Sequence, residues 1–233
     1  MKLPAHLQVV ATPIHKAGWP FIAIALVASL LLGLVAEALL WLGLIVTGWV
    51  AYFFRDPHRV VPDGDELVVS PADGTVIAVT ARRPPPELEL GDAPRTCISV
   101  FLSIFDVHVN RAPATGRIAR LAYRPGKFLN AALDKASEEN ERQSLRLETS
   151  SGEALGVVLI AGLVARRIVG FVREGQELRA GERIALIRFG SRADVYLPDG
   201  MSPLVVPGQR AIGGETVLAE GRGNRPWRSG RRI

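Results

Sequence analysis

A long apolar block near the N-terminus is the feature that most constrains this chain. Residues 20–54 contain a single charged side chain, Glu37. One continuous helix of that length would run roughly 52 Å, which exceeds a hydrocarbon core of about 30 Å. Two passes, Trp19–Ala36 and Ala38–Phe54 with a turn near Glu37, fit better. Each pass is slightly short, so a re-entrant hairpin is also open. The block predicts a membrane-anchoring helical hairpin.

Basic residues flank this block on both sides. Lys2 and Lys16 precede it, and Arg55 and Arg59 follow it. Because cytoplasmic flanks carry the excess of Lys and Arg, both ends are expected in the cytoplasm, with the anchor in the cell (inner) membrane. Two other interpretations are a signal peptide cut at Ala36-Glu37-Ala38 and a buried hairpin of a soluble fold. A cut there would leave a second apolar stretch behind.

The charge balance points to an anionic partner. The net charge is +5, and arginine dominates, with 24 Arg against 4 Lys. Such a composition suits nucleic acid or an anionic membrane surface. The basic stretches lack interleaved aromatic residues, so we predict anionic membrane lipids and no nucleic acid as partners. The Arg-rich segment 221–233 is predicted to be a disordered basic tail, either lying on lipid headgroups or simply solvated.

The remainder of the chain is typical of a mainly β protein. Short apolar runs alternate with Gly, Pro and Asp, and Asn130–Glu141 is the one candidate for a helix or ordered loop in this part. The single cysteine, Cys97, lies in an apolar run and is predicted to be a small buried hydrophobe. The expected strands are Glu66–Ser70, Gly74–Ala81, Arg95–Leu102, Gly116–Tyr123, Ser144–Ser150, Ala154–Ala161, Arg167–Val172, Arg183–Arg188, Ala193–Leu197 and Glu215–Ala219.

Gly175 and Gly181 lie six residues apart, with apolar residues around them. This spacing resembles that of the small β-sandwich carriers of lipoyl or biotinyl groups. Those carriers need an acceptor lysine, and no lysine follows Lys135. The pattern therefore indicates architecture: a β-sandwich or barrel-like catalytic domain with lipoyl-carrier-like features, joined to the helical hairpin. The sequence has no P-loop, no dinucleotide-binding loop and no zinc-ligand spacing.

Gly190-Ser191 interrupts the β pattern after the apolar run Ile184–Ile187. A serine hydroxyl can attack the preceding carbonyl if the backbone is strained and a base is close. Glycine favours this because it has no Cβ and tolerates positive φ. The same dipeptide is also one of the commonest turn sequences, so an ordinary turn between strands stays open.

Taken together, four features resemble one family. They are the N-terminal hairpin, the motif Ser70–Gly74, the motif Phe101–Pro113 and Phe189-Gly190-Ser191. In this order and spacing the chain is similar to the short prokaryotic phosphatidylserine decarboxylases. The resemblance implies that Ser191 attacks Gly190, that the chain splits into a β chain (1–190) and an α chain (191–233), and that Ser191 becomes a pyruvoyl group. That group would form a Schiff base with phosphatidylserine during decarboxylation to phosphatidylethanolamine, with no metal and no pyridoxal phosphate.

The resemblance also implies roles for three side chains. His108 would act as general acid or base. Asp73 would orient a base or help to activate Ser191. Longer bacterial relatives carry a second histidine three positions after the first, where this chain has Arg111. Either His108 therefore serves both maturation and decarboxylation, or Arg111 has another task, such as holding a substrate carboxylate or phosphate.

These features suggest three segments: an anchor over 1–55, a self-cleaved decarboxylase domain over 56–220 and the tail. The product would be a heterodimer of its own two chains, and a higher oligomer is open. Other hypotheses are a membrane-anchored β-sandwich adaptor or envelope component without catalysis, and a decarboxylase of a related serine lipid such as archaetidylserine. A pyruvoyl enzyme for a soluble amino acid would need no anchor.

Overall fold

The chain folds into two compact units, residues 1–58 and 59–233. Each unit is described by itself. The structure is a computed structural model, and it describes residues 12–126, 140–149, 151–162, 167–188 and 190–221.

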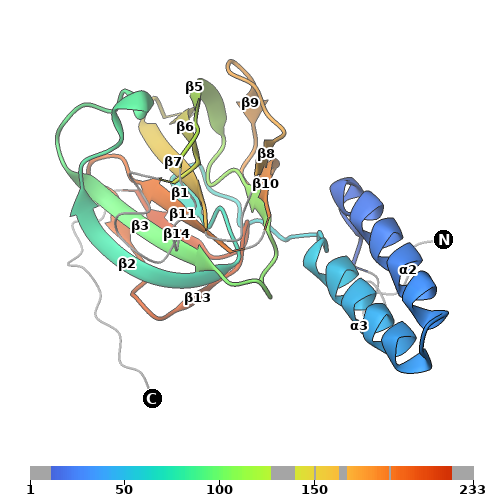
Figure 1. Ribbon diagram of the computed structural model, residues 1–233. Helices are drawn as coiled ribbons and strands as arrows, with labels where there is room; N and C mark the ends of the chain where they lie inside the picture. The colour runs from blue at the N-terminus through green and yellow to red at the C-terminus, as the bar shows by residue number, and fades with distance from the viewer. Residues whose placement is uncertain (1–11, 127–139, 150, 163–166, 189, 222–233) are drawn as a thin grey trace, which may run out of the picture. The chain divides into compact units, whose positions relative to one another are not determined.

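The first unit is a helical hairpin (Figure 1). A 3-10 turn, η1 (Lys16–Gly18), leads into α2 (Trp19–Gly33), and α3 (Glu37–Phe53) returns alongside it. Small side chains let the two helices approach closely, as is common for helices in membranes. A Cβ on Gly43 would lie 2.5 Å from the Ser29 hydroxyl oxygen, which itself lies 3.2 Å from the Thr47 hydroxyl oxygen.

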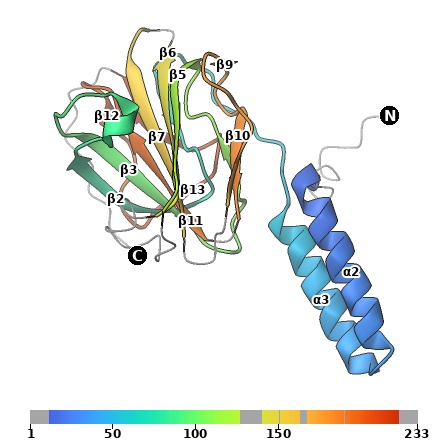
Figure 2. The ribbon, with the colours of Figure 1, turned by 45° about the horizontal axis from the view of Figure 1, so that its top comes forward.

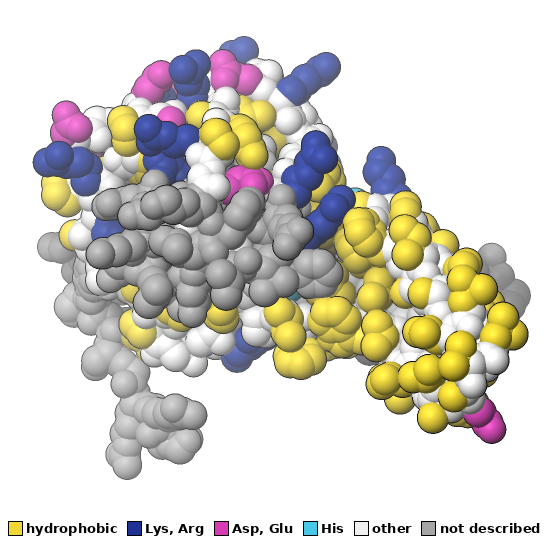
Figure 3. Space-filling model, in the orientation of Figure 1, with side chains coloured by type: hydrophobic (Ala, Val, Ile, Leu, Met, Phe, Trp, Pro, Cys, Tyr) yellow, Lys and Arg dark blue, Asp and Glu magenta, His cyan; other side chains and the backbone are white. Residues whose placement is uncertain are grey.

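Hydrophobic side chains cover the visible face of this hairpin (Figure 3). Within the described residues, one helical segment, Lys16–Gly33, is long and apolar enough to cross a membrane, and α3 is a shorter apolar helix. Without η1, α2 measures only about 22 Å at 1.5 Å per residue, and α3 measures about 25 Å, so each α-helix alone is shorter than a hydrocarbon core of about 30 Å. The expected apolar hairpin is present, and it turns at residues 34–36, just before Glu37.

The second unit is built from β-strands. They are β1 (Leu67–Val69), β2 (Gly74–Arg82), β3 (Arg95–Leu102), β4 (Val109–Arg111), β5 (Gly116–Arg124), β6 (Arg142–Thr149), β7 (Ala154–Ala161), β8 (Ile168–Gly170), β9 (Glu177–Leu178), β10 (Arg183–Ile187), β11 (Ser191–Tyr196), β12 (Ser202–Pro203), β13 (Arg210–Ala211) and β14 (Val217–Glu220). A short 3-10 turn, η2 (Pro86–Leu88), lies between β2 and β3. The predicted mainly β fold is confirmed.

Among the described residues these strands form three sheets (Figure 2). The large sheet has the order β13-β2-β3-β11-β7-β6-β5-β9, and it curls around the main core. Two three-stranded sheets, β4-β10-β8 and β1-β14-β12, contribute side chains to the same core. Strand β11 lies between β3 and β7, antiparallel to both. The residues that follow Gly190 are therefore held at the centre of the large sheet.

All ten strands expected from the sequence have counterparts, and Arg95–Leu102 and Ala154–Ala161 match to the residue. The missed strands, β4, β9, β12 and β13, have two or three residues each, which is too short for alternation to be visible. Gly175 and Gly181 adopt φ of 82° and 81°, as expected for turn glycines. Cys97 is buried, as predicted. The candidate helix lies outside the described residues apart from Asn140 and Glu141, and so does nearly all of the basic tail.

Candidate active site

Ser191 opens strand β11 in the middle of the large sheet. It pairs with Leu102 on one side and Ala161 on the other, and it is fully buried. Both neighbours belong to the main core, so the Ser191 side chain faces that core. Its hydroxyl oxygen has no hydrogen-bond partner among the described residues. A buried hydroxyl without a partner carries a desolvation cost, and such groups mark functional positions.

Gly190 holds the peptide group that Ser191 would attack. Its φ is 65°, a left-handed conformation that costs an L-residue about 1–2 kcal/mol and is free for glycine. Its carbonyl oxygen accepts a hydrogen bond from the Gly162 N–H at 2.9 Å. Its own N–H donates to Nε2 of His108 at 3.2 Å. The carbonyl is thus polarised by one donor, while an imidazole nitrogen lies beside the same residue.

These contacts fix the tautomer of His108, which is completely buried. A backbone N–H can only donate, so Nε2 must carry a lone pair. The proton of the neutral ring is then on Nδ1, which donates to the Asp106 carbonyl at 2.9 Å. The basic nitrogen therefore faces Gly190.

The Asp106 side chain stabilises the turn that precedes His108. Its carboxylate accepts the Ser103 N–H at 2.8 Å and pairs with Arg210. Burial raises the pKa of Asp106, but the hydrogen bonds from Arg210 and Ser103 outweigh this and leave the pKa below its ordinary value. The side chain stays ionised at neutral pH. Its bond from the Ser103 N–H is therefore kept, and the Asp106 carbonyl is held where it accepts from His108 Nδ1.

Asp73 lies in a separate polar cluster with Arg59. The two carboxylate oxygens of Asp73 accept from Arg59 Nη2 at 2.9 and 2.7 Å, and the Gly213 N–H donates to Oδ1 at 2.8 Å. Burial raises the pKa of Asp73 above its ordinary value, while Arg59 and the Gly213 N–H oppose that effect. These contacts hold Asp73 to the loop before β14, and they do not pair it with His108.

Arg111 points away from the His108 side of its strand. Side chains alternate along an extended strand, so His108 and Arg111, three positions apart, lie on opposite faces. The buried guanidinium of Arg111 donates from Nη1 to the Gly181 carbonyl at 2.9 Å. Its Cδ lies close to Gly214, next to the residue that binds Asp73.

The structure thus brings Gly190, Ser191 and His108 together and places Asp73 and Arg111 in the adjoining cluster. Sequence reasoning missed two features near these residues. The Gly162 N–H is a backbone group that no motif reveals. Asn110 is fully buried with both amide atoms unpartnered. Period-two alternation from His108 could have identified Asn110, had the short strand β4 been recognised.

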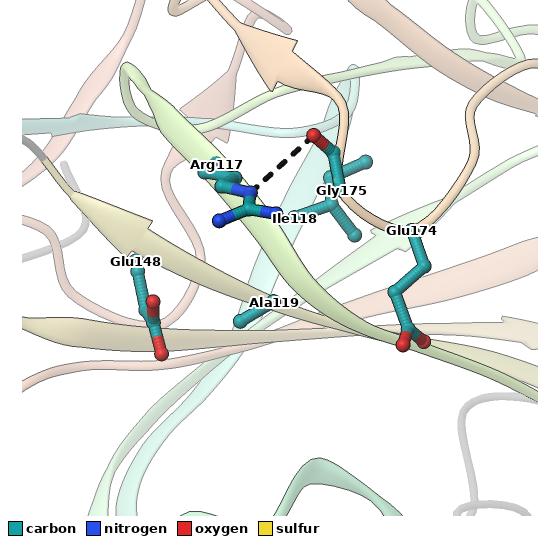
Figure 4. A pocket seen from close by; sticks show the side chains of 6 residues that line it. All are labelled: Arg117, Ile118, Ala119, Glu148, Glu174 and Gly175. Carbon is teal, nitrogen blue, oxygen red and sulfur yellow. Dashed lines mark hydrogen bonds between the residues drawn. The ribbon is translucent and has the colours of Figure 1, made fainter.

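Other candidate sites in the described residues carry no comparable chemistry. A cleft of about 500 Å³ lies on β5 and beside the β8–β9 loop, lined by Arg117, Glu148 and Glu174, and Arg117 donates to the Gly175 carbonyl (Figure 4). It contains none of the predicted site residues. Within the described part of the chain, no group of three or more His, Cys, Asp or Glu side chains could hold a metal ion. Burial raises the pKa of the Cys97 thiol, which keeps it protonated.

Comparison with known proteins shows which family this sequence belongs to. The family model for phosphatidylserine decarboxylase matches residues 46–219. The chain is 57% identical over 208 residues to a phosphatidylserine decarboxylase proenzyme of Paramagnetospirillum magneticum, covering 89% of this chain and 87% of that protein. It is 55% identical over 226 residues to one of Beijerinckia indica, covering 97% of both chains. On these matches the chain belongs to the phosphatidylserine decarboxylase family.

Proposed function

We propose that this protein decarboxylates phosphatidylserine to phosphatidylethanolamine, using a pyruvoyl group that it makes from its own Ser191. One observation carries the proposal: the unpartnered hydroxyl of Ser191 directly follows a left-handed glycine whose N–H meets His108 and whose carbonyl meets the Gly162 N–H. An ordinary β-turn needs neither a buried imidazole nor a buried free hydroxyl.

Maturation begins with an acyl shift. The Ser191 hydroxyl oxygen bonds to the Gly190 carbonyl carbon, the peptide C–N bond breaks, and the hydroxyl proton ends on the freed amine. Nε2 of His108 is the basic nitrogen beside Gly190, and we propose that it relays that proton once its lone pair releases the Gly190 N–H. Negative charge develops on the Gly190 oxygen, where the Gly162 N–H stabilises it.

Elimination then separates the two chains. Loss of the Ser191 Cα proton breaks the Cβ–Oγ bond, and Gly190 leaves as a carboxylate at the end of the β chain. The dehydroalanine left on the α chain tautomerises to an imine, and water hydrolyses it to the keto group with release of ammonia. The atoms and electrons of these steps balance with water as the only added reactant, without an external oxidant or a metal.

The residues present fit such a group. Because Ser191 is paired on both sides, the new N-terminus of the α chain stays between β3 and β7, facing the core. The keto group supplies an electron-withdrawing carbonyl for decarboxylation. His108 Nε2 binds the N–H of Gly190, one residue before this position, and is proposed to carry the proton that replaces the lost carboxylate. Asp73, with Arg59, is proposed to support maturation from the adjoining cluster.

The test is the intact mass of the detergent-solubilised protein. We expect two species divided between Gly190 and Ser191, with the small chain lighter than its serine form and labelled by borohydride in the presence of an amine. A Ser191→Ala variant should remain one chain. A single uncut chain from membranes that actively decarboxylate phosphatidylserine would contradict the mechanism and favour an anchored adaptor.

The proposed substrate is a phospholipid, so the enzyme must work at a membrane. We propose that the apolar hairpin anchors the enzyme on the cytoplasmic side of the cell membrane, where anionic lipids attract its basic surface. A variant lacking residues 1–58 should lose co-sedimentation with phosphatidylserine vesicles yet still self-cleave, because every described contact of Gly190, Ser191 and Asp73 comes from the second unit. Vesicle binding that is unchanged by the deletion would refute the anchor.

A further inference from the structure

Asn110 is a fully buried amide to which nothing so far has assigned a task. Neither its oxygen nor its nitrogen has a hydrogen-bond partner among the described residues. Since both atoms are unsatisfied, the conclusion does not depend on which way the amide is turned. Leaving a buried polar group unpaired costs about 1–3 kcal/mol, so a fold without a use for Asn110 would be more stable with an apolar residue there.

The register of β4 places Asn110 on the same side as His108. Asn110 pairs with Ala185 of β10, Val109 pairs with Leu186, and the ladder continues to His108, whose carbonyl accepts the Ile187 N–H at 3.2 Å. Ala185 and Ile187 face the main core, whereas Leu186 does not belong to it. Directly opposed residues in an antiparallel pair share a face. His108 and Asn110 therefore both face the core.

Ser191 faces that same core from the other sheet, because its partners Leu102 and Ala161 belong to it. The unpartnered hydroxyl and the unpartnered amide thus face the same core. His108 lies two positions before Asn110, and its Nε2 accepts the N–H of Gly190, the residue before Ser191. Arg111 lies on the opposite face of β4 and is engaged with the Gly181 carbonyl.

We propose that Asn110 binds the carboxylate of the substrate's serine headgroup through its side-chain N–H donors. This inference rests on the proposed decarboxylation at Ser191. The substrate amine must reach the group made from Ser191, and standard geometry puts the carboxylate carbon roughly 2.5 Å from that amine. The carboxylate must therefore lie within the interior that Asn110 faces.

A neutral amide suits this carboxylate better than an arginine does. Decarboxylation removes the negative charge from the carboxylate, so a strong ion pair would stabilise the bound substrate more than the transition state. A neutral donor still orients the carboxylate by hydrogen bonding, but it stabilises the negative charge less than an arginine would. This assigns to Asn110 the headgroup contact that the sequence suggested for Arg111.

The test uses Asn110→Leu and Asn110→Asp in the full-length protein. We expect both variants to split at Gly190-Ser191 as the wild type does, by intact mass. With phosphatidylserine in mixed micelles, kcat/KM should fall by about 100-fold or more, in the range for a lost substrate hydrogen bond that leaves a buried charge unpaired. Asn110→Leu should keep or raise Tm, because it removes two unsatisfied polar atoms.

A second readout separates headgroup binding from a general defect. Borohydride-dependent coupling of the small chain to phosphatidylethanolamine, which has no carboxylate, should proceed at the wild-type rate in both variants. Coupling to phosphatidylserine should be at least tenfold slower. Asn140→Leu is the matched control for stability: Asn140 is equally buried but donates to the Ala161 carbonyl at 2.8 Å, so its loss should lower Tm.

Three results for the Asn110 variants would overturn the assignment. The first is a kcat/KM within threefold of wild type, and the second is equal slowing of coupling to both lipids. The third is a variant chain that stays uncut, which would place Asn110 in maturation. If Asn110→Leu does not fold, Asn110→Asp, which preserves side-chain volume, decides by the same criteria. A wild-type protein that neither splits nor decarboxylates would instead refute the proposed function itself.

Discussion

At the scale of single residues, the geometry around Gly190 depends on which ring nitrogen of His108 carries the proton. Nε2 of His108 is the acceptor for Gly190, and Nδ1 is held by the Asp106 carbonyl. This pairing orients the ring with its Nε2 lone pair on the N–H of Gly190, the residue whose carbonyl Ser191 would attack. The tautomer of the imidazole is therefore set by two backbone groups, without a second side chain.

We predict that His108→Ala slows splitting at Gly190-Ser191 by about 10²–10⁴-fold, the range for loss of a general base. The time course of splitting after synthesis, followed by intact mass, measures this. His58→Ala is the control, because His58 is exposed and belongs to the first unit, and it should split normally. A His108 variant that is fully split and fully active would remove His108 from the mechanism.

Asp106 makes a pH-dependent contribution at the same scale. Its pKa in the folded protein lies below the ordinary value of 3.8, so its ion pair with Arg210 stabilises the fold above that pH and is lost as the pH falls through the lower folded value. Arg210 is largely exposed, so the contribution is about 1 kcal/mol or less. Urea unfolding from about pH 6 to about pH 3 should show a smaller acid loss for Asp106→Asn than for wild type. Equal losses would show that the pair contributes nothing.

At the scale of elements, the long strands followed from apolar runs bounded by turn residues, whereas the site did not. β3 and β7 have eight residues each, long enough for such a run to be recognised, and β7 has no polar side chain at all. β4 has three residues and is held by its pairing with β10, a contact distant in sequence. Local sequence does not show which distant strand β4 pairs with. The motif around His108 could therefore be recognised, but not which of its side chains face the core. For the same reason Ser191 was expected to precede β11, and it is the first residue of that strand.

Strand β11 also carries a buried ion pair on the face opposite Ser191. Arg192 Nε and Nη2 donate to the Asp194 oxygens at 2.6 and 2.7 Å, and both side chains are almost fully buried. Removing one partner leaves a buried charge, at a cost of about 3–5 kcal/mol, whereas replacing both by apolar residues is close to neutral.

We therefore predict that Asp194→Leu alone strongly destabilises the protein, and that adding Arg192→Met restores most of the loss. Urea unfolding of the two single variants and the double variant gives the coupling energy. A double variant that is as unstable as the sum of the singles would show that the two charges do not act as a pair. Splitting in the double variant should persist, because neither side chain faces the core side of β11.

At the scale of the whole molecule, the sequence was enough to predict an apolar hairpin followed by a mainly β unit, because both follow from composition and periodicity. The order of strands in the large sheet was not predictable. It places β11, from the last fifth of the chain, between β3 and β7, and only long-range packing decides such neighbours.

That order leads to the last prediction, which concerns the split protein. The proposed α chain supplies β11, which is paired on both edges, and also β12, β13 and β14, which pair with one another or with β1 and β2. It buries Val195, Leu197 and Leu218 completely, together worth roughly 5–9 kcal/mol at 1.5–3 kcal/mol each. We expect the two chains to co-elute in native size-exclusion chromatography and to separate only in denaturant. Elution of a free small chain in native buffer would contradict this, because cutting the bond before β11 breaks chain connectivity without exposing either edge of the strand.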